Sequence, residues 1–226
     1  MIGTPEQLLS SLSLFAGVPQ AVLDEVAKAG QPQTWPAGKV LFQRGDESTF
    51  LIAMESGHVR ISLQTEGGRE FVLQHVRGKA VIGEIGLLDG STRTADATVA
   101  APVVGLLFEG RRYAQLTEKH PELAQAAIRH LCKLLRYTTD HIEGIALYTL
   151  EARLARFLLD SQPDGAASFA LELSQSEIAD LVGASRPKVN QTLAALESAG
   201  AIARKGAAIT CDRAALRRIG GLAEDA

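Results

Sequence analysis

The feature that most constrains this chain is a series of short apolar or alternating segments between residues 33 and 108, separated by residues typical of turns. Such segments are typical of β-strands. Short strands at regular spacing favour a closed sandwich or barrel over a parallel sheet. The expected strands include Val40–Phe42, Phe50–Met54, Val59–Leu63, Phe71–Leu73 and Val103–Phe108. The turns are Pro36–Gly38, Gly45–Asp46, Ser56–Gly57, Gly67–Gly68, Gly78 and Asp89–Gly90.

Helical patterns lie on both sides of this region. Residues 6–29 predict two short helices, interrupted at Gly17–Pro19. A long helix is expected from Pro121 to about residue 146, because polar and apolar positions recur at spacings of three and four. Such a stripe forms either a dimer seam or a buried core helix, and we favour the seam because a compact barrel leaves few surfaces to cover it. The stripe contains Ala127, Leu131, Leu134, Thr138, His141 and Ile145.

The C-terminal part contains the pattern of a helix-turn-helix. After a helix at about Leu150–Leu159, Ser174 and Glu177 have the spacing of a capping box, which opens a helix. Gly183 then supplies a tight turn, Ser185 can cap a second helix, and Pro187 is tolerated in its first turn. Ordinary helical hairpins also have this spacing. The inner face of the second helix consists of Val189, Leu193 and Leu196.

The outward face of that second helix carries side chains suited to reading DNA bases. Arg donates to guanine, Asn and Gln pair with adenine, and Lys contacts guanine or phosphate. A basic turn at Arg204 and Lys205 joins two short strands after the helix, as in a wing that touches phosphate. The helix residues expected at the DNA are Ser185, Arg186, Lys188, Asn190 and Gln191.

Composition narrows the classes of protein. The net charge is −3, so any DNA contact is local, and 46% hydrophobic residues indicate an ordinary globular chain. No apolar segment approaches the ~20 residues of a membrane span, so we expect no membrane contact and a cytoplasmic location. Cys132 and Cys211 lack metal-site spacing and are expected to be buried or unreactive. No metal pair or nucleophile–base pattern suggests an enzyme, so we expect neither catalytic residues nor a metal site.

The segment Ile82–Leu88 followed by Asp89–Ala95 has the chemistry of a cyclic phosphate site. The guanidinium of Arg93 can meet a phosphodiester with two parallel charge-assisted hydrogen bonds, and Thr94 adds a hydroxyl donor. Glu84 cannot lie against phosphate but is suited to accept from a ribose 2′-hydroxyl. The segment resembles the phosphate-binding cassette of cyclic-nucleotide-binding domains. With the helix and winged motif that follow, the chain resembles the cAMP receptor protein/fumarate-nitrate regulator (CRP/FNR) family over nearly its whole length.

The resemblance implies roles for individual residues. It implies that Gly83 and Glu84 contact ribose, that Arg93 and Thr94 contact phosphate, and that Thr138 and Thr139 meet the adenine amino edge, one from each subunit in effect. The implied effector is cAMP, with cGMP as the alternative, and no covalent cofactor is expected. The implied partners are a second copy of the chain, an inverted-repeat DNA operator and RNA polymerase.

The expected fold class is α+β. It has an N-terminal cyclic-nucleotide-binding-type β-barrel (double-stranded β-helix or jelly roll) over residues 1–120, a long dimerisation helix over 121–146 and a C-terminal winged helix-turn-helix over 147–226. The corresponding function is a ligand-responsive, DNA-binding transcription regulator. One alternative keeps the cassette as architecture, with Glu84 and Arg93 paired across the turn and another effector or none. Another is a cyclic-nucleotide-binding protein that regulates a protein partner.

Three departures from relatives within the family bear on function. His75 could be compared with a haem ligand, but it has no convincing second axial ligand and is expected to be an ordinary strand histidine. The cysteine cluster of the iron–sulfur branch is missing. In the cAMP receptor the recognition helix has the pattern Ser-Arg-Glu-Thr-Val-x-Arg; here Pro187 replaces the Glu and Gln191 the second Arg, so the same operator is not expected.

Overall fold

The computed structural model describes residues 4–64, 70–163, 166, 168–171, 173–206 and 208–222, apart from the side chains of His141 and Asp180. The turn predicted at Gly67–Gly68 lies outside these residues. The chain forms two compact units, Met1–Arg136 and Tyr137–Ala226, and helix α5 (Pro121–Leu147) contributes to both. Within the described ranges, no helix has the length and apolar character needed to cross a bilayer.

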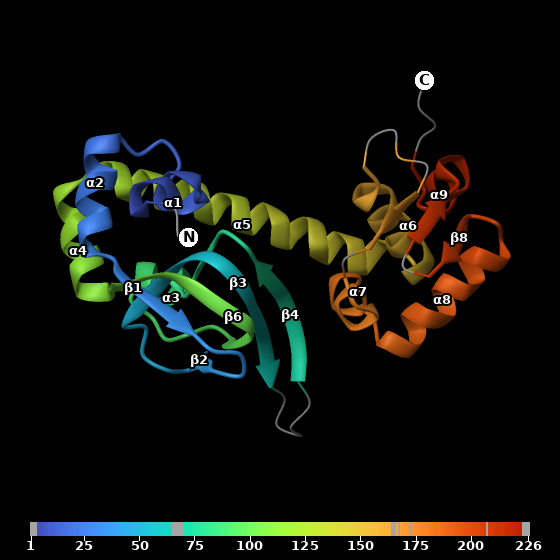
Figure 1. Cartoon of the computed structure of the whole chain (residues 1–226), viewed down its shortest axis with the longest axis horizontal. Helices are drawn as coiled ribbons and strands as arrows, with labels where there is room; N and C mark the ends of the chain where they lie inside the picture. The colour runs from blue at the N-terminus through green and yellow to red at the C-terminus, as the bar shows by residue number, and fades with distance from the viewer. Residues whose placement is uncertain are drawn as a thin grey trace. The chain divides into compact units, whose positions relative to one another are not determined.

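The first unit is built on a curved antiparallel sheet (Figure 1). Its main path runs β1-β6-β3-β4, with β2 paired to β6 and β5 paired to β3. The expected barrel is therefore confirmed, and its cassette lies between β5 and β6. The strands are β1 (Gln31–Trp35), β2 (Val40–Phe42), β3 (Phe50–Gln64), β4 (Glu70–Arg77), β5 (Ala80–Ile82) and β6 (Asp96–Glu109).

The turn predicted at Ser56–Gly57 is wrong. The two segments that flank it form one continuous strand, β3, whose pairing with β6 shifts register at this point. Gly57 has φ +114°, and a Cβ there would lie 2.4 Å from the carbonyl oxygen of Pro102. The glycine therefore permits a bulge in β3 and a close approach of β3 to β6. Glycine in a strand pattern can mark such a bulge instead of a turn.

Short helices cover the ends of this sheet. They are α1 (Pro5–Ser11), the 3₁₀ turn η1 (Ser13–Phe15), α2 (Gln20–Ala29), α3 (Glu84–Asp89) and α4 (Gly110–Lys119). Leu8, Leu14 and Phe15 are buried with Phe108 of β6 in the core beneath these helices. Leu87 and Leu88 of the cassette helix α3 pack against this core, and a second core fills the sheet interior.

The second unit has the predicted winged helix-turn-helix. The capping box is confirmed, because the Ser174 backbone N–H donates to Glu177 Oε2 at 2.8 Å and the Glu177 N–H donates to Ser174 Oγ at 3.3 Å. Ser185 is the N-cap residue of α8, but its side chain makes no capping hydrogen bond. The elements are α6 (Leu150–Ser161), β7 (Ser168–Ala170), α7 (Gln175–Leu181), α8 (Arg186–Ser198), β8 (Ile202–Lys205), β9 (Ala208–Cys211) and α9 (Arg213–Ile219).

Candidate functional site

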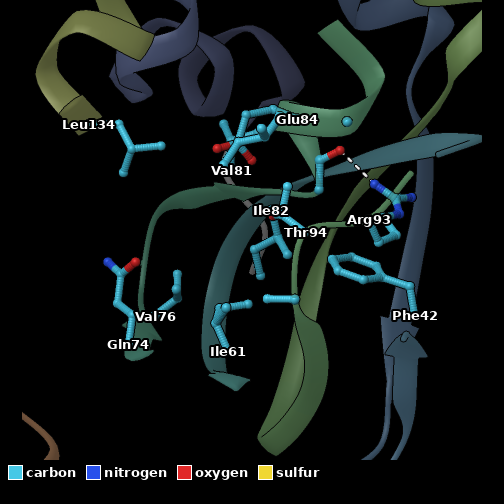
Figure 2. A pocket seen from close by; sticks show the side chains of 14 residues that line it. Phe42, Ile61, Gln74, Val76, Val81, Ile82, Glu84, Arg93, Thr94 and Leu134 are labelled. Carbon is cyan, nitrogen blue, oxygen red and sulfur yellow. Dashed lines mark hydrogen bonds between the residues drawn. The ribbon is translucent and has the colours of Figure 1, made fainter. Parts of the chain in front are cut away.

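The cassette lines a cavity of about 110 Å³ in the first unit. Figure 2 shows Arg93 on one side of this pocket and Gln74, from β4, on the other. The wall between them is largely apolar and includes Leu134 of α5. All four cassette residues expected at a ligand line the cavity: Gly83, Glu84, Arg93 and Thr94.

Arg93 is held by the protein itself. The residue is only 3% exposed; Nη1 donates to the Gly83 carbonyl at 2.6 Å and Nη2 to the Phe50 carbonyl at 2.7 Å. The guanidinium carbon lies 4.1 Å from the ring centroid of Phe42 and 4.6 Å from that of Phe50. Burial lowers the pKa of the Arg93 guanidinium, an effect opposed by the carboxylates of Asp46 and Glu84. The buried Nε of Arg93 has no hydrogen-bond partner among the described residues.

Gly83 and Glu84 begin helix α3 beside this arginine. Gly83 is the N-cap residue with φ +82°, and a Cβ there would lie 2.5 Å from Arg93 Nη1. Both strain and crowding therefore favour glycine. Glu84 is 7% exposed and makes no hydrogen bond with Arg93, so the pairing across the turn is not formed. Its Oε1 lies 3.4 Å from Nε2 of His130. Thr94 is exposed at the cavity.

Helix α5 presents a different stripe from the predicted one. Ala127 is buried in the core of the first unit and Leu134 lines the pocket, so neither faces outward as a seam residue. Three of the exposed apolar residues recur every seven positions: Ile128 (61%), Leu135 (68%) and Ile142 (61%). Leu131, Thr138 and Ile145 complete a three–four repeat with them, which is the spacing of a coiled-coil seam.

Thr138 and Thr139 both have exposed side chains on α5. They follow Leu134, which lines the pocket, along the same helix. They belong to the second unit, whereas the pocket belongs to the first.

In the second unit, α8 has the two faces that the sequence predicts. Val189, Leu193 and Leu196 are buried, whereas most of the expected DNA-contacting side chains are exposed. Asn190 is the exception: it is half-buried, and its Oδ1 atom is enclosed without a hydrogen-bond partner among the described residues. The exposed residues of the helix and its cap are Ser185, Arg186, Lys188 and Gln191.

Arg204 and Lys205, the two basic residues predicted for the wing, have different surroundings in the structure. Arg204 donates to Oε2 of Glu197 from Nε at 3.1 Å and from Nη2 at 2.7 Å. These hydrogen bonds hold the pKa of the Glu197 carboxyl below its ordinary value. Lys205 is exposed and forms no ion pair with any residue that the structure describes. The two cations are therefore not equivalent.

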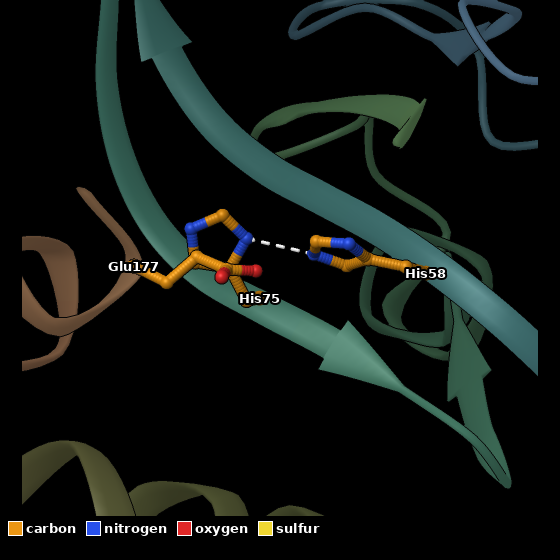
Figure 3. A group of neighbouring side chains, drawn as sticks. All are labelled: His58, His75 and Glu177. Atoms are coloured by element: carbon orange, nitrogen blue, oxygen red, sulfur yellow. Dashed lines mark hydrogen bonds between the residues drawn. The ribbon is translucent and has the colours of Figure 1, made fainter. Parts of the chain in front are cut away.

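His75 has a partner that the sequence did not reveal. His58 Nε2 lies 2.8 Å from His75 Nδ1, as Figure 3 shows. The register explains the approach, because His58 pairs with Arg77 and Arg60 with His75 across β3 and β4. Burial lowers the pKa of His58 to about 4, and the positive charges of Arg77, His75 and Arg60 add to the effect.

Three further side chains that contact Arg93 or Glu84 were not singled out from the sequence: Phe42, Phe50 and His130. The two phenylalanines belong to segments recognised only as strand-formers, and their stacking on Arg93 depends on the closure of the sheet. His130 lies on the predicted helix, four residues before Leu134. That spacing would have placed it on the same face as a pocket residue.

Comparison with known proteins gives two family matches. The cyclic nucleotide-binding domain matches residues 32–120, and the Crp-like helix-turn-helix domain matches residues 152–219. A CRP-like cAMP-activated global transcriptional regulator of Mycobacterium tuberculosis is 29% identical over 210 residues, covering 90% of this chain and 94% of the relative.

Solved structures show the same fold. The c-di-GMP responsive global regulator CLP of Xanthomonas campestris has a TM-score of 0.71 at 24% identity, covering 85% of this chain and 99% of that one. The catabolite activator protein of Thermus thermophilus has a TM-score of 0.53 at 27% identity, covering 93% and 100%. With both domains matched in the order found in these proteins, the chain belongs to the CRP/FNR family of transcription regulators.

Proposed function

We propose that this chain is a dimeric transcription regulator whose DNA affinity is controlled by a cyclic nucleotide, with cAMP as the favoured effector. The observation that carries the proposal is the meeting of Gly83, Glu84, Arg93 and Thr94 in one cavity whose remaining wall is largely apolar. A cyclic phosphodiester has one delocalised negative charge, which a buried guanidinium complements. A carboxylate beside it accepts from the ribose 2′-hydroxyl, and apolar side chains cover the base.

The proposed dimer brings the hydroxyls of α5 to the base. With Ile128, Leu135 and Ile142 at the a positions of a parallel coiled coil, Leu134 is at g and Thr139 at the following e. Residues at g and e of opposite chains are neighbours in such a coil. Leu134 lines the pocket, so the partner's Thr139 is the hydroxyl expected nearest to a bound base.

The same dimer sets the form of the operator. Two α8 helices related by a two-fold axis read an inverted repeat with half-sites about one helical turn apart. Arg186 is the proposed guanine reader, with Lys188, Gln191 and Lys205 as further contacts. The proposal includes RNA polymerase as the further partner, a cytoplasmic location and no catalytic step.

A calorimetric titration with cAMP, cGMP and c-di-GMP tests the ligand. We expect one cAMP per chain, weaker binding of cGMP, and loss of binding in Arg93→Ala. If the wild-type chain binds none of the three, the cassette is not a cyclic nucleotide site. If c-di-GMP alone binds, the effector assignment is wrong.

A second candidate is a regulator that keeps the cassette as architecture. The hydrogen bonds from Arg93 to two backbone carbonyls favour it, because they give the guanidinium a structural role. This candidate predicts operator binding with no ligand response. A regulator of a protein partner instead predicts no DNA affinity at all. Selection from a random DNA pool separates that case from the first proposal, and operator affinity measured with and without cAMP separates the architecture-only regulator from it.

A further inference from the structure

Glu84 is a buried carboxylate whose orientation depends on one imidazole. Its side chain is 10% exposed and that of His130 is 13% exposed, with 3.4 Å between Oε1 and Nε2. A buried carboxylate oxygen needs a hydrogen-bond donor, because its burial without one costs free energy. The contact with His130 therefore bears directly on the direction of the Glu84 carboxyl group.

The other nitrogen of the same imidazole is also engaged. Nδ1 of His130 lies 2.7 Å from the hydroxyl oxygen of Ser13, in η1. When the Ser13 hydroxyl donates to Nδ1, the ring proton is on Nε2 and can be donated to Glu84. A carboxylate only accepts, whereas a hydroxyl donates or accepts, so the Glu84 contact selects this tautomer and the Ser13 hydroxyl is compatible with it. Ser13, His130 and Glu84 form a continuous chain of polar groups from the N-terminal segment to the pocket.

The helix that carries His130 is already part of the pocket. Leu134 lies four residues later on α5, on the same helical face, and lines the cavity beside Glu84. A carboxylate has about four lone-pair positions, so a hydrogen bond to Oε1 leaves Oε2 able to accept another donor. His130 can therefore hold Glu84 without competing with a ligand for it.

We propose that His130 is a positioning residue that turns the Glu84 carboxylate toward the ribose and so sets the preference of the pocket for ribonucleotides over 2′-deoxyribonucleotides. This inference rests on the proposed cyclic-nucleotide function. His130 Nε2–H donates to Oε1, the Ser13 hydroxyl donates to Nδ1 of the same ring, and Oε2 accepts from the 2′-hydroxyl. The 2′-deoxy ligand lacks that hydroxyl and gains nothing from the orientation of Glu84.

The test is calorimetric binding of cAMP and 2′-deoxy-cAMP to the full chain and its variants. We expect the wild type to prefer cAMP by about tenfold or more, the effect of one charge-assisted hydrogen bond. His130→Ala should lose most of that preference, as Glu84→Gln does, while its affinity for 2′-deoxy-cAMP changes less than about twofold. His130→Gln, which retains a donor near the position of Nε2, should restore part of the preference.

The two ligands distinguish positioning from packing. If His130→Ala weakens both ligands by the same factor, His130 only supports the fold, and the inference is overturned. It is also overturned if His130→Ala keeps the preference for cAMP over 2′-deoxy-cAMP while Glu84→Gln loses it. The proposed cyclic-nucleotide function then still stands. If the wild type binds neither ligand, both fail. Should His130→Ala not fold, Ser13→Ala gives the same readout, with a smaller loss of preference expected, because Ser13 is exposed.

Discussion

Nη1 of Arg93 donates a 2.6 Å hydrogen bond to the carbonyl oxygen of Gly83, the N-cap residue of α3. The cation of the cassette and the start of its helix are thus joined directly. A ligand phosphate that accepts a hydrogen bond from Arg93 would therefore also affect Gly83, the residue at which α3 begins. Because of this link, we expect ligand binding to depend on the guanidinium group of Arg93 and not only on its positive charge.

Arg93→Lys is expected to weaken cAMP binding by about ten- to 150-fold, equivalent to one charge-assisted hydrogen bond of about 1.5–3 kcal/mol. A lysine keeps the charge but loses the planar fork that reaches two carbonyls and stacks between two rings. Calorimetry checks this, with Arg111→Lys on the exposed side of α4 as the matched control. Equal affinity for both variants would show that Arg93 acts as a point charge only.

Leu135→Glu is expected to convert the dimer to monomer. Leu135 is 68% exposed in the single chain and lies in the centre of the proposed seam, so the change would bury two like charges against each other. The dissociation constant of the dimer should rise by at least about a hundredfold. Light scattering after size-exclusion chromatography measures it. Lys133→Glu, two positions away at an outward position, should remain dimeric; a monomeric control or a dimeric Leu135→Glu would contradict the seam.

The wing cations should differ in their response to salt. Lys205→Ala is expected to weaken all DNA sequences alike and reduce the slope of log affinity against log salt by about one. Arg204→Ala should change that slope much less, because Glu197 already balances its charge. Fluorescence anisotropy across a salt series measures both. An equal reduction of the salt slope in both variants would mean that DNA binding breaks the Arg204–Glu197 ion pair.

His58 is expected to titrate near pH 4 in the folded protein, against an ordinary value of 6.5. Its folded pKa is lowered, so the unfolded chain binds the proton first as the pH falls. The contribution of His58 to stability is therefore complete above about 6.5 and is lost as the pH drops toward 4. Proton NMR of the imidazole, assigned by its absence in His58→Gln, gives the midpoint. A midpoint near 6.5 would contradict the burial argument.

Patterns local in sequence predicted most of the fold. The glycine-punctuated strands, the long helix and the capping box each depend on residues a few positions apart, and all three are present. Gly57 misled the strand assignment because one residue type serves both turns and bulges. Cys132 was expected to be buried or unreactive but is exposed, since a helix position alone does not say which face is covered.

The site was predictable where a continuous motif carries it. Gly83, Glu84, Arg93 and Thr94 lie within one short segment, and the structure brings them to one cavity. The partners that hold them were not predictable, because Phe42, Phe50 and His130 reach the cassette only through the closed sheet and the path of α5. Two positions of the predicted stripe were wrongly assigned for a similar reason: Ala127 and Leu134 fit the helical period but are used by the chain's own core and pocket.

Helix α5 begins in the first unit and ends in the second, and we expect it to couple the pocket to the DNA-reading helix. A ligand shifts such an equilibrium only by its different affinity for the two states. Coupling of this kind typically changes affinity by about 5- to 150-fold, and it is reciprocal.

The most direct measurement is therefore the affinity of the wild-type dimer for its selected inverted-repeat operator, with and without saturating cAMP, together with the affinity for cAMP with and without that operator. We predict that both affinities change, by the same factor and in the same direction. Two unchanged affinities, with cAMP bound in both cases, would contradict the account and leave the pocket without control over DNA binding.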